Sequence, residues 1–533
     1  MKTITKRVLA IAGVLALGLT AVKAQADSAL LDALVKKGVL SNQEAQDIQA
    51  SEAKEYSTTA ASKLTIGSYI KNITFYGDGR LRFENINQHY EYQTPYVNDR
   101  ERYRIRVGAD YTYSDHLKAG FELESGTASD SGNQTIGSMF TKSSINVGKI
   151  YLQYAPVDWL TLTAGKFTNP WYETTDMVYS NDLNPEGGAE VVNFTFPLDG
   201  GSSAPVSRDP KAINDPKAMA PVSASSGSSL SVGLTSVQYL YINSNESTFP
   251  SGLNNNDVQI IGNQIPITWK INKDLTFKVA PGFTFYTGGG NTNYDGGVPI
   301  NYTNNGQTPV YVYGTANSSV DPVFVSPRES DDLNVVSAPG EFDFKVANVP
   351  FRPYWDFDWN VTGKQRIQNV YLDPTASVPT IGTANSVLSQ NKALGDNVAW
   401  AAGLQIGQNK KKGDWSILGE FRQIGLGAVD QNINGSDYAD SYANQEGLKF
   451  SGVYNFTDFL TGTVTFYDTW AYKDNLYSAL GGSPSAAPGA SPSSTTGTKT
   501  PSATTSALAG GTTQALVAEK SLQRIQVDIG WKF

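Results

Sequence analysis

The last nine residues of the chain alternate strictly between apolar and polar side chains. One face of the extended strand carries Ile525, Val527, Ile529, Trp531 and Phe533, and the other carries Gln526, Asp528, Gly530 and Lys532. Such a strand suits lipid on one side and water on the other, as in outer-membrane barrels. A soluble β-sandwich strand can also alternate, but it has no need to end the chain on an aromatic residue. We therefore predict an all-β transmembrane antiparallel barrel, with Trp531 and Phe533 as the signal for the barrel-assembly machinery.

The N-terminus has the layout of a secretory signal peptide. Basic residues precede an apolar run over 8–19, and Ala24-Gln25-Ala26 fits a cleavage site, so residues 1–26 should be removed. That run is too short to span a membrane comfortably, and no later stretch reaches the roughly 18 apolar residues that a membrane helix needs. If the protein is in a membrane, strands must cross it, and only a closed barrel pairs all of their backbone groups.

Composition excludes several other functions. The chain has no cysteine, which rules out disulfides and thiolate metal sites. Loss of the four basic residues of the signal peptide changes the formal net charge from −9 to −13 (−9 − 4), which argues against nucleic-acid binding. The two histidines, His89 and His116, fall in a predicted loop and a turn, with no serine elbow nearby. We predict neither an enzyme nor a cofactor.

Residues 27–60 differ from the rest of the chain. Ser28 can cap a short helix that Gly38 ends, and Ser41 with Glu44 has the capping-box spacing for a second helix. We predict a small periplasmic helical hairpin. Its apolar face can pack on itself, contact a trimer partner or contact the cell wall, and the sequence leaves these alternatives open.

From Ile73 onward, alternating segments are joined on one side by short turns that contain aspartate, such as Asp115, Asp158 and Asp458. The opposite connections are long and polar. Short turns on one rim and long extracellular loops on the other are typical of outer-membrane barrels. We count sixteen strands within a barrel domain over 61–533, with fourteen or eighteen as alternatives, and place two of them at 341–361 and 364–372. The Ser- and Pro-rich stretch 482–513 reads as a disordered loop.

Five arginines fall on the inward faces of the first two strands, namely Arg80, Arg82, Arg102, Arg104 and Arg106. A sixteen-stranded barrel is wide enough for an aqueous channel, so this basic ladder should line it. The ladder can be a salt-bridge network that joins neighbouring strands, or a strip that screens solutes by charge, as basic rings do in pores. Both roles are compatible.

The loop after the fifth strand is the candidate constriction. It runs from Gly165 to Gly188 and combines aromatic residues, prolines and acids, which suits a folded segment. If it folds into the lumen, its acids would face the arginine ladder across the pore. These acids are Glu173, Asp176, Asp182 and Glu186. The alternative is an ordinary extracellular loop.

The chain resembles the putative-porin family of Gram-negative outer membranes. The resemblance rests on the secretory signal, Gly38-Val39-Leu40-Ser41, the Gly165-Lys166 to Asn169-Pro170 junction, the run from Asp182 to Gly187, and Phe533. It implies passive diffusion of small hydrophilic solutes and homotrimers. This family is distantly similar to phosphate-selective porins. Beyond the five arginines, however, the chain has no lysine-rich stripe to support selectivity for phosphate.

Two functions remain after these exclusions. The first is an outer-membrane porin that forms a water-filled channel and is surrounded by outer-membrane lipids. The second is a structural outer-membrane protein that links the envelope through residues 27–60. Bilayer conductance separates them, because only the first requires an open pore.

Overall fold

The computed structural model describes residues 70–90, 96–126, 131–137, 139–198, 227–242, 258–287, 333–371, 395–431, 433–473 and 519–533. The predicted signal peptide, the helical hairpin over 27–60 and the loop over 482–513 lie outside these residues. Lys71–Phe533 form one compact unit. Among the described residues, no helix combines the length and the apolar character needed to cross a membrane.

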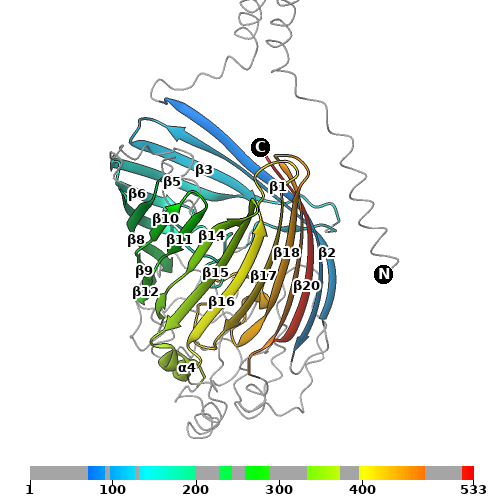
Figure 1. Ribbon diagram of the computed structural model, residues 1–533. Coiled ribbons are helices and arrows are strands. Elements are labelled where there is room, and N and C mark those ends of the chain that lie inside the picture. The colour runs from blue at the N-terminus through cyan, green and yellow to red at the C-terminus, as the bar shows by residue number, and fades with distance from the viewer. Residues whose placement is uncertain are drawn as a thin grey trace, which may run out of the picture. The chain divides into compact units, whose positions relative to one another are not determined.

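The strands pair edge to edge, antiparallel, around a closed barrel (Figure 1). The first strand pairs with the second on one side and with the last on the other, so the sheet leaves no free edge. The strands are β1 (Asn72–Tyr90), β2 (Tyr96–Thr112), β3 (Leu117–Ser125), β4 (Gln134–Thr135), β5 (Ile145–Val157), β6 (Leu160–Lys166), β7 (Glu186–Pro197), β8 (Ser229–Ile242), β9 (Val258–Gln264), β10 (Ile267–Asn272), β11 (Leu275–Val279), β12 (Gly282–Thr287), β13 (Asn334–Ser337), β14 (Gly340–Val346), β15 (Val349–Asn360), β16 (Val398–Gly407), β17 (Trp415–Ile424), β18 (Gln445–Asn455), β19 (Leu460–Ala471) and β20 (Glu519–Lys532). Within the described residues, the helical elements are α4 (Gly363–Tyr371) and the 3₁₀ turn η5 (Ala439–Ser441).

These twenty segments make sixteen wall strands. β9 with β10, β11 with β12, and β13 with β14 are each one interrupted strand, and β4 only adds a short pairing to β2, which leaves 20 − 4 = 16. The prediction of sixteen strands is therefore confirmed. The interruptions fall at Pro266, Pro281 and Pro339. Proline has no N–H to donate to the ladder, so each of these three neighbouring strands breaks where its proline sits.

Two of the predicted strands were wrong: one is in fact two strands, and the other is a helix. The segment predicted as one strand over 341–361 is β14 and β15, which a turn at Ala347-Asn348 separates. Both turn residues have positive φ, 50° and 68°, as a tight two-residue hairpin turn requires. No glycine marks this turn, which is why the sequence hid it. The predicted strand over 364–372 is instead α4, and the two errors cancel in the count.

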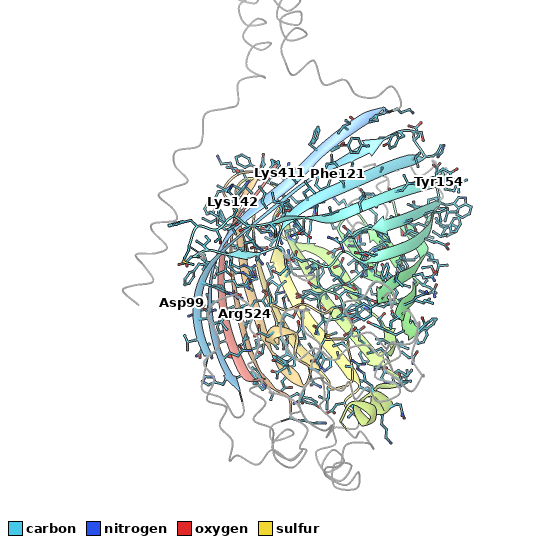
Figure 2. The ribbon with its side chains drawn as sticks, turned by 180° about the vertical axis from the view of Figure 1, so that it is seen from behind. Asp99, Phe121, Lys142, Tyr154, Lys411 and Arg524 are labelled. Carbon is cyan, nitrogen blue, oxygen red and sulfur yellow. The ribbon has the colours of Figure 1, made fainter. Side chains whose placement is uncertain are left out.

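The two faces of the wall differ as the alternation predicts. On β20 the inward Arg524, Gln526 and Asp528 are 1%, 2% and 9% exposed, whereas the outward Ile525 is 40% exposed. Outward aromatic residues gather beside the short turns, where Trp159 stacks on Phe194 with ring centroids 5.6 Å apart. Figure 2 shows the side chains on both faces of the wall. Aromatic girdles of this kind mark the membrane interface of a barrel.

Two connections fold inward and pack with the wall. We call residues 167–185, between β6 and β7, the crossing segment, and the described residues of 425–444, between β17 and β18, the seam segment. Each contributes to a buried apolar cluster that includes wall residues. The crossing segment brings Phe167, Trp171 and Tyr179, and the seam segment brings Val429, Tyr438 and Ala443. Apolar burial therefore holds both connections in a folded form.

Candidate functional site

The arginine ladder lies on β1 and β2, which the structure places side by side. In their register Arg80 is opposite Arg104, and Arg82 is opposite Arg102. Like charges directly opposite one another on a sheet destabilise it. The ladder therefore needs carboxylates from neighbouring strands and from the segments inside the barrel.

Wall carboxylates meet part of this need. Asp528 on β20 accepts two hydrogen bonds from Arg82, at 2.7 and 2.8 Å. Asp78 on β1 accepts from Arg104 at 3.0 Å and from Arg106 at 2.7 Å. Bidentate and shared geometries of this kind are the stronger class of charged hydrogen bonds. The salt-bridge reading of the ladder thus has direct geometric support.

The remaining two arginines differ from each other. Arg102 lies 3.7 Å from Glu84, a buried carboxylate that also accepts from Arg100. Arg80 donates to the amide oxygen of Asn133 at 2.7 Å, and within the described residues no carboxylate lies within salt-bridge distance of it. Arg80 is therefore the ladder member whose charge is least compensated by the part of the protein described.

The crossing segment spans the lumen. Near its start Tyr172 exchanges two hydrogen bonds with the Gln264 side chain on β9, both 2.9 Å long. Further along, Thr175 donates to Asp356 on β15 at 2.8 Å. In the order of strand pairing, β15 lies across the barrel from β6 and β7, so the contact of Thr175 with Asp356 holds the segment against the opposite wall.

Two of the four predicted constriction acids face basic residues inside the barrel. Asp182 lies 2.9 Å from Arg104 and 3.5 Å from Arg106, so it joins the ladder. Asp176 instead accepts from Arg422 on β17 at 2.7 Å. Burial alone would raise the pKa of Asp176, but Arg422 and then Lys449 outweigh it and lower that pKa to about 2. Asp176 is therefore charged at neutral pH.

The other two predicted acids lie elsewhere. Glu173 lies near Tyr179: burial of that side chain, and then the charge of Glu173, raise the pKa of the Tyr179 phenol. Glu186 is the first residue of β7, pairs with Lys166 at 2.9 Å, and has a side chain that is 65% exposed. By the alternation of β7, it shares the outward face with the exposed Glu190. The structure thus does not bring Glu186 to the arginine ladder.

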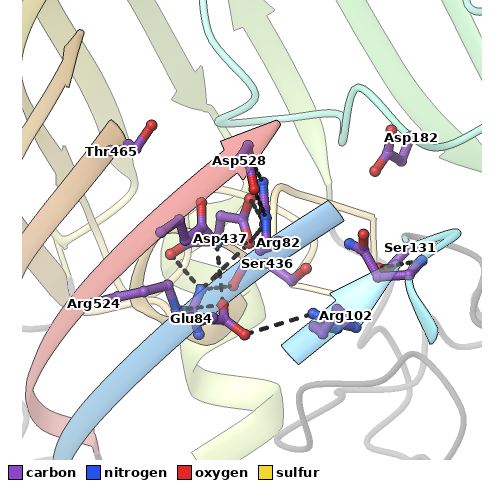
Figure 3. A network of polar contacts seen from close by, with 12 residues as sticks. Arg82, Glu84, Arg102, Ser131, Asp182, Ser436, Asp437, Thr465, Arg524 and Asp528 are labelled. Atoms are coloured by element: carbon purple, nitrogen blue, oxygen red, sulfur yellow. Dashed lines mark hydrogen bonds and ion pairs between the residues drawn. The ribbon is translucent and has the colours of Figure 1, made fainter. Parts of the chain in front are cut away.

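The seam segment supplies carboxylates that the sequence did not reveal. Asp437 lies 3.3 Å from Arg82 on β1 and accepts from Gln526 on β20 at 2.8 Å (Figure 3). Burial would raise the pKa of Asp437, but Arg82 and Arg524 outweigh it and hold this pKa well below its usual range. Asp440 accepts from Gln88 on β1 at 2.7 Å and also pairs with Arg524 on β20.

Arg422 joins the two inward segments. Its side chain is 1% exposed and contacts both Asp176 and Glu420 at 2.7 Å. Its guanidinium lies 4.6 Å from the ring of Tyr438 in the seam segment, a cation–π contact. The segments also meet directly, because the Ser180 N–H donates to the Ile433 carbonyl at 2.7 Å. A shift of one segment must therefore disturb the other.

Part of this site was within reach of the sequence. Arg422 and Arg524 lie in phase with the inward residues of β17 and β20, so alternation alone could have added them to the basic set. Asp437 and Asp440 follow no period, because they belong to a connection without repeating structure. Among the described residues, no group of three or more His, Asp or Glu side chains could hold a metal ion.

The described strands form a closed sixteen-stranded antiparallel β-barrel with charged side chains on its inner face. Residues 69–293 match the family described as "Putative porin", which confirms the expected resemblance over this part of the chain. No curated protein matches the sequence. The family match and the barrel together support an outer-membrane channel rather than an enzyme.

The chain is similar, at low sequence identity, to several solved outer-membrane proteins. OprB of Pseudomonas putida, in its high-pH structure, is 10% identical, with coverage of 87% of this chain and 94% of that one and a TM-score of 0.42. OmpF of Salmonella typhi, in complex with daunomycin, is 11% identical, with coverage of 88% and 99% and a TM-score of 0.40. The channel DcaP of Acinetobacter baumannii is 10% identical, with coverage of 87% and 97% and a TM-score of 0.37. Likeness at this level says nothing about what crosses this barrel.

Proposed function

We propose that this protein is an outer-membrane porin through which small hydrophilic solutes diffuse passively. The observation that carries the proposal is the inward face of a closed sixteen-stranded barrel, which is lined by charged residues and crossed by a segment fixed at both walls. Sixteen strands enclose a lumen wider than side chains alone can fill. A polar, crossed lumen suits hydrated solutes rather than apolar ones.

The crossing segment should set the size limit of this pore. Its Asp182 is bound to the ladder on β2, whereas Asp176 is bound to Arg422 on β17, so the segment is anchored on two sides of the lumen. Because the segment is held at both ends, it narrows the pore by a constant amount and does not swing across it. Solutes would pass beside these ion pairs, and the size of a solute would matter more than its identity.

Conductance across a planar lipid bilayer tests the proposal. Folded, purified protein should insert in discrete steps and give open, water-filled channels. A folded sample that never conducts, while a known porin conducts in the same membranes, would overturn the proposal. It would favour the alternative in which the protein ties the envelope together through residues 27–60.

A further inference from the structure

The seam segment docks where the barrel closes. β1 and β20 are the first and last strands of the wall, and their pairing alone joins the two ends of the sheet. The seam segment starts from β17, so it reaches past β18 and β19 to arrive there. No other described connection contacts side chains of both terminal strands through its carboxylates.

Two of its three acids, Asp437 and Asp440, bridge the closing strands. Asp437 binds Arg82 of β1 and Gln526 of β20, and Asp440 binds Gln88 of β1 and Arg524 of β20. The main chain adds to this, because Arg524 also donates to the carbonyl oxygens of Ser436 and Asp437. One short segment thus holds side chains from both sides of the seam.

The arginines at the seam depend on this contact. With the segment docked, the side chains of Arg82 and Arg524 are 4% and 2% exposed, so a carboxylate removed by substitution is not replaced by water. A buried charge without its partner is strongly unfavourable. With the segment undocked, Arg82 would keep Asp528 and Arg524 would keep Glu84, but neither would retain its full set of acids.

The backbone of the segment adds a second observation. Ala439, Asp440 and Ser441 all have positive φ, at 50°, 49° and 70°. Residues other than glycine adopt this region at a cost, and a run of three persists only where the surroundings enforce it. Here Ala439 is fully buried and Asp440 is bound on both sides, so docking at the seam holds the strained turn in place.

We propose that the seam segment is a strap that fastens β20 to β1 and so stabilises the closed barrel. It lies inside the lumen, yet its main effect is on the wall. This role goes beyond conduction, because it concerns whether the ends of the sheet stay paired. The competing reading is that the segment only fills space in the lumen, in which case its loss would weaken no particular strand pair.

A double substitution tests the strap. Asp437→Asn with Asp440→Asn removes both bridging carboxylates but keeps side-chain volume. The matched control, Asp182→Asn with Asp343→Asn, also removes two inward carboxylates and leaves each basic partner one acid, because Arg104 keeps Asp78 and Lys278 keeps Glu341. Neither of these two acids bridges β1 and β20. The temperature at which the compact folded band is lost on electrophoresis should fall by several degrees more in the strap variant than in the control.

A disulfide at the seam sharpens the test, since the chain has no cysteine of its own. Leu81→Cys with Ile529→Cys joins a directly opposed pair across β1 and β20, and Val107→Cys with Leu123→Cys joins an equivalent pair across β2 and β3. Opposed strand residues are close enough for such a bond. The seam disulfide should restore most of the stability lost in the strap variant, whereas the β2–β3 disulfide should not.

Two results would overturn the proposal. One is an equal loss of stability in the strap variant and its control, and the other is equal rescue by both disulfides. If the double variant fails to assemble, Asp440→Asn alone is tested with each disulfide in place, and recovery of assembly only with the seam disulfide supports the strap. Since the readout is folding, the outcome is independent of whether the protein conducts.

Discussion

The crossing segment and the seam segment both fold into the lumen, but they hold to the wall differently. The crossing segment touches distant strands through separated contacts, with Gln264, Asp356, Arg422 and Arg104 each on a different strand. The seam segment places two of its three acids, Asp437 and Asp440, on one pair of adjacent strands, whereas Asp430 accepts a hydrogen bond from Tyr286 on β12. The first arrangement suits narrowing a path, and the second suits joining two edges. A barrel can thus use the same device, an inward fold, for two purposes.

Deleting each segment should separate these purposes and give the largest effects. Replacing residues 170–182 by a short glycine-containing turn should raise single-channel conductance several-fold. It should also lower stability, since Arg422 and Arg104 each lose one acid, but it leaves the contacts across β1 and β20 in place. Replacing residues 428–443 in the same way should lower stability more than the first deletion does and raise conductance less. The loss of stability follows because Arg82 and Arg524 lose partners at the seam. Bilayer recordings and urea unfolding in lipid vesicles measure the two quantities. If the two deletions change conductance equally and stability equally, the two segments do not serve different purposes.

Substitution of Arg422 should disturb both inward segments at once, because this residue contacts each of them. Arg422→Met leaves the buried Glu420 and Asp176 without their main basic partner, which should cost about 3–5 kcal/mol of the free energy of unfolding. Arg352→Met is the control, since its side chain is 32% exposed and lies 3.4 Å from Glu341, and it should cost about 1 kcal/mol or less. Denaturant unfolding compares them, and similar losses would mean that Arg422 is not the link.

The contribution of Asp176 should depend on pH. Its pKa falls from 3.8 in the unfolded chain to about 2 in the folded protein, so the charged form is favoured by folding. The stabilisation is then complete above pH 4 and is lost as the pH falls towards 2. The stability difference between the wild type and Asp176→Asn should be constant from pH 7 to 5 and shrink below 4. A difference that stays flat down to pH 2 would contradict the assigned ion pair.

Charge selectivity should give the smallest effects. Arg104→Gln with Arg106→Gln leaves Asp78 and Asp182 uncompensated, so reversal potentials under a salt gradient should shift modestly towards cations. The shift should shrink at 1 M salt, where the Debye length is about 3 Å. Glu186→Gln should give no shift, because this residue lies on the outward face beside Lys166. A shift from Glu186→Gln as large as that from the arginines would place it in the conducting path.

Much of the wall could be predicted from alternation. Period two placed Arg80, Arg82, Arg102, Arg104 and Arg106 on one face of two strands, and the register of β1 and β2 agrees. The prediction failed around 341–372, where Ala347 and Asn348 form a turn without glycine, since positive φ at such residues depends on the surrounding sheet. Alternation could not place Glu173, Asp176 or Asp182, because they lie in a connection, and Glu186 is in a strand only as the first residue of β7.

The sequence by itself determined the class of fold. Its side-chain period, its short aspartate turns and its aromatic terminus each involve residues that are close in sequence. Such features can be recognised without knowledge of the tertiary structure. Only the tertiary structure decided which acids meet which arginines. Asp437 and Arg82 are separated by 355 residues, and Arg82 and Asp528 by 446, so their contacts exist only once the sheet has closed and both inward segments have docked. Closure of the barrel brings such distant residues together, and no local sequence pattern predicts which of them will meet.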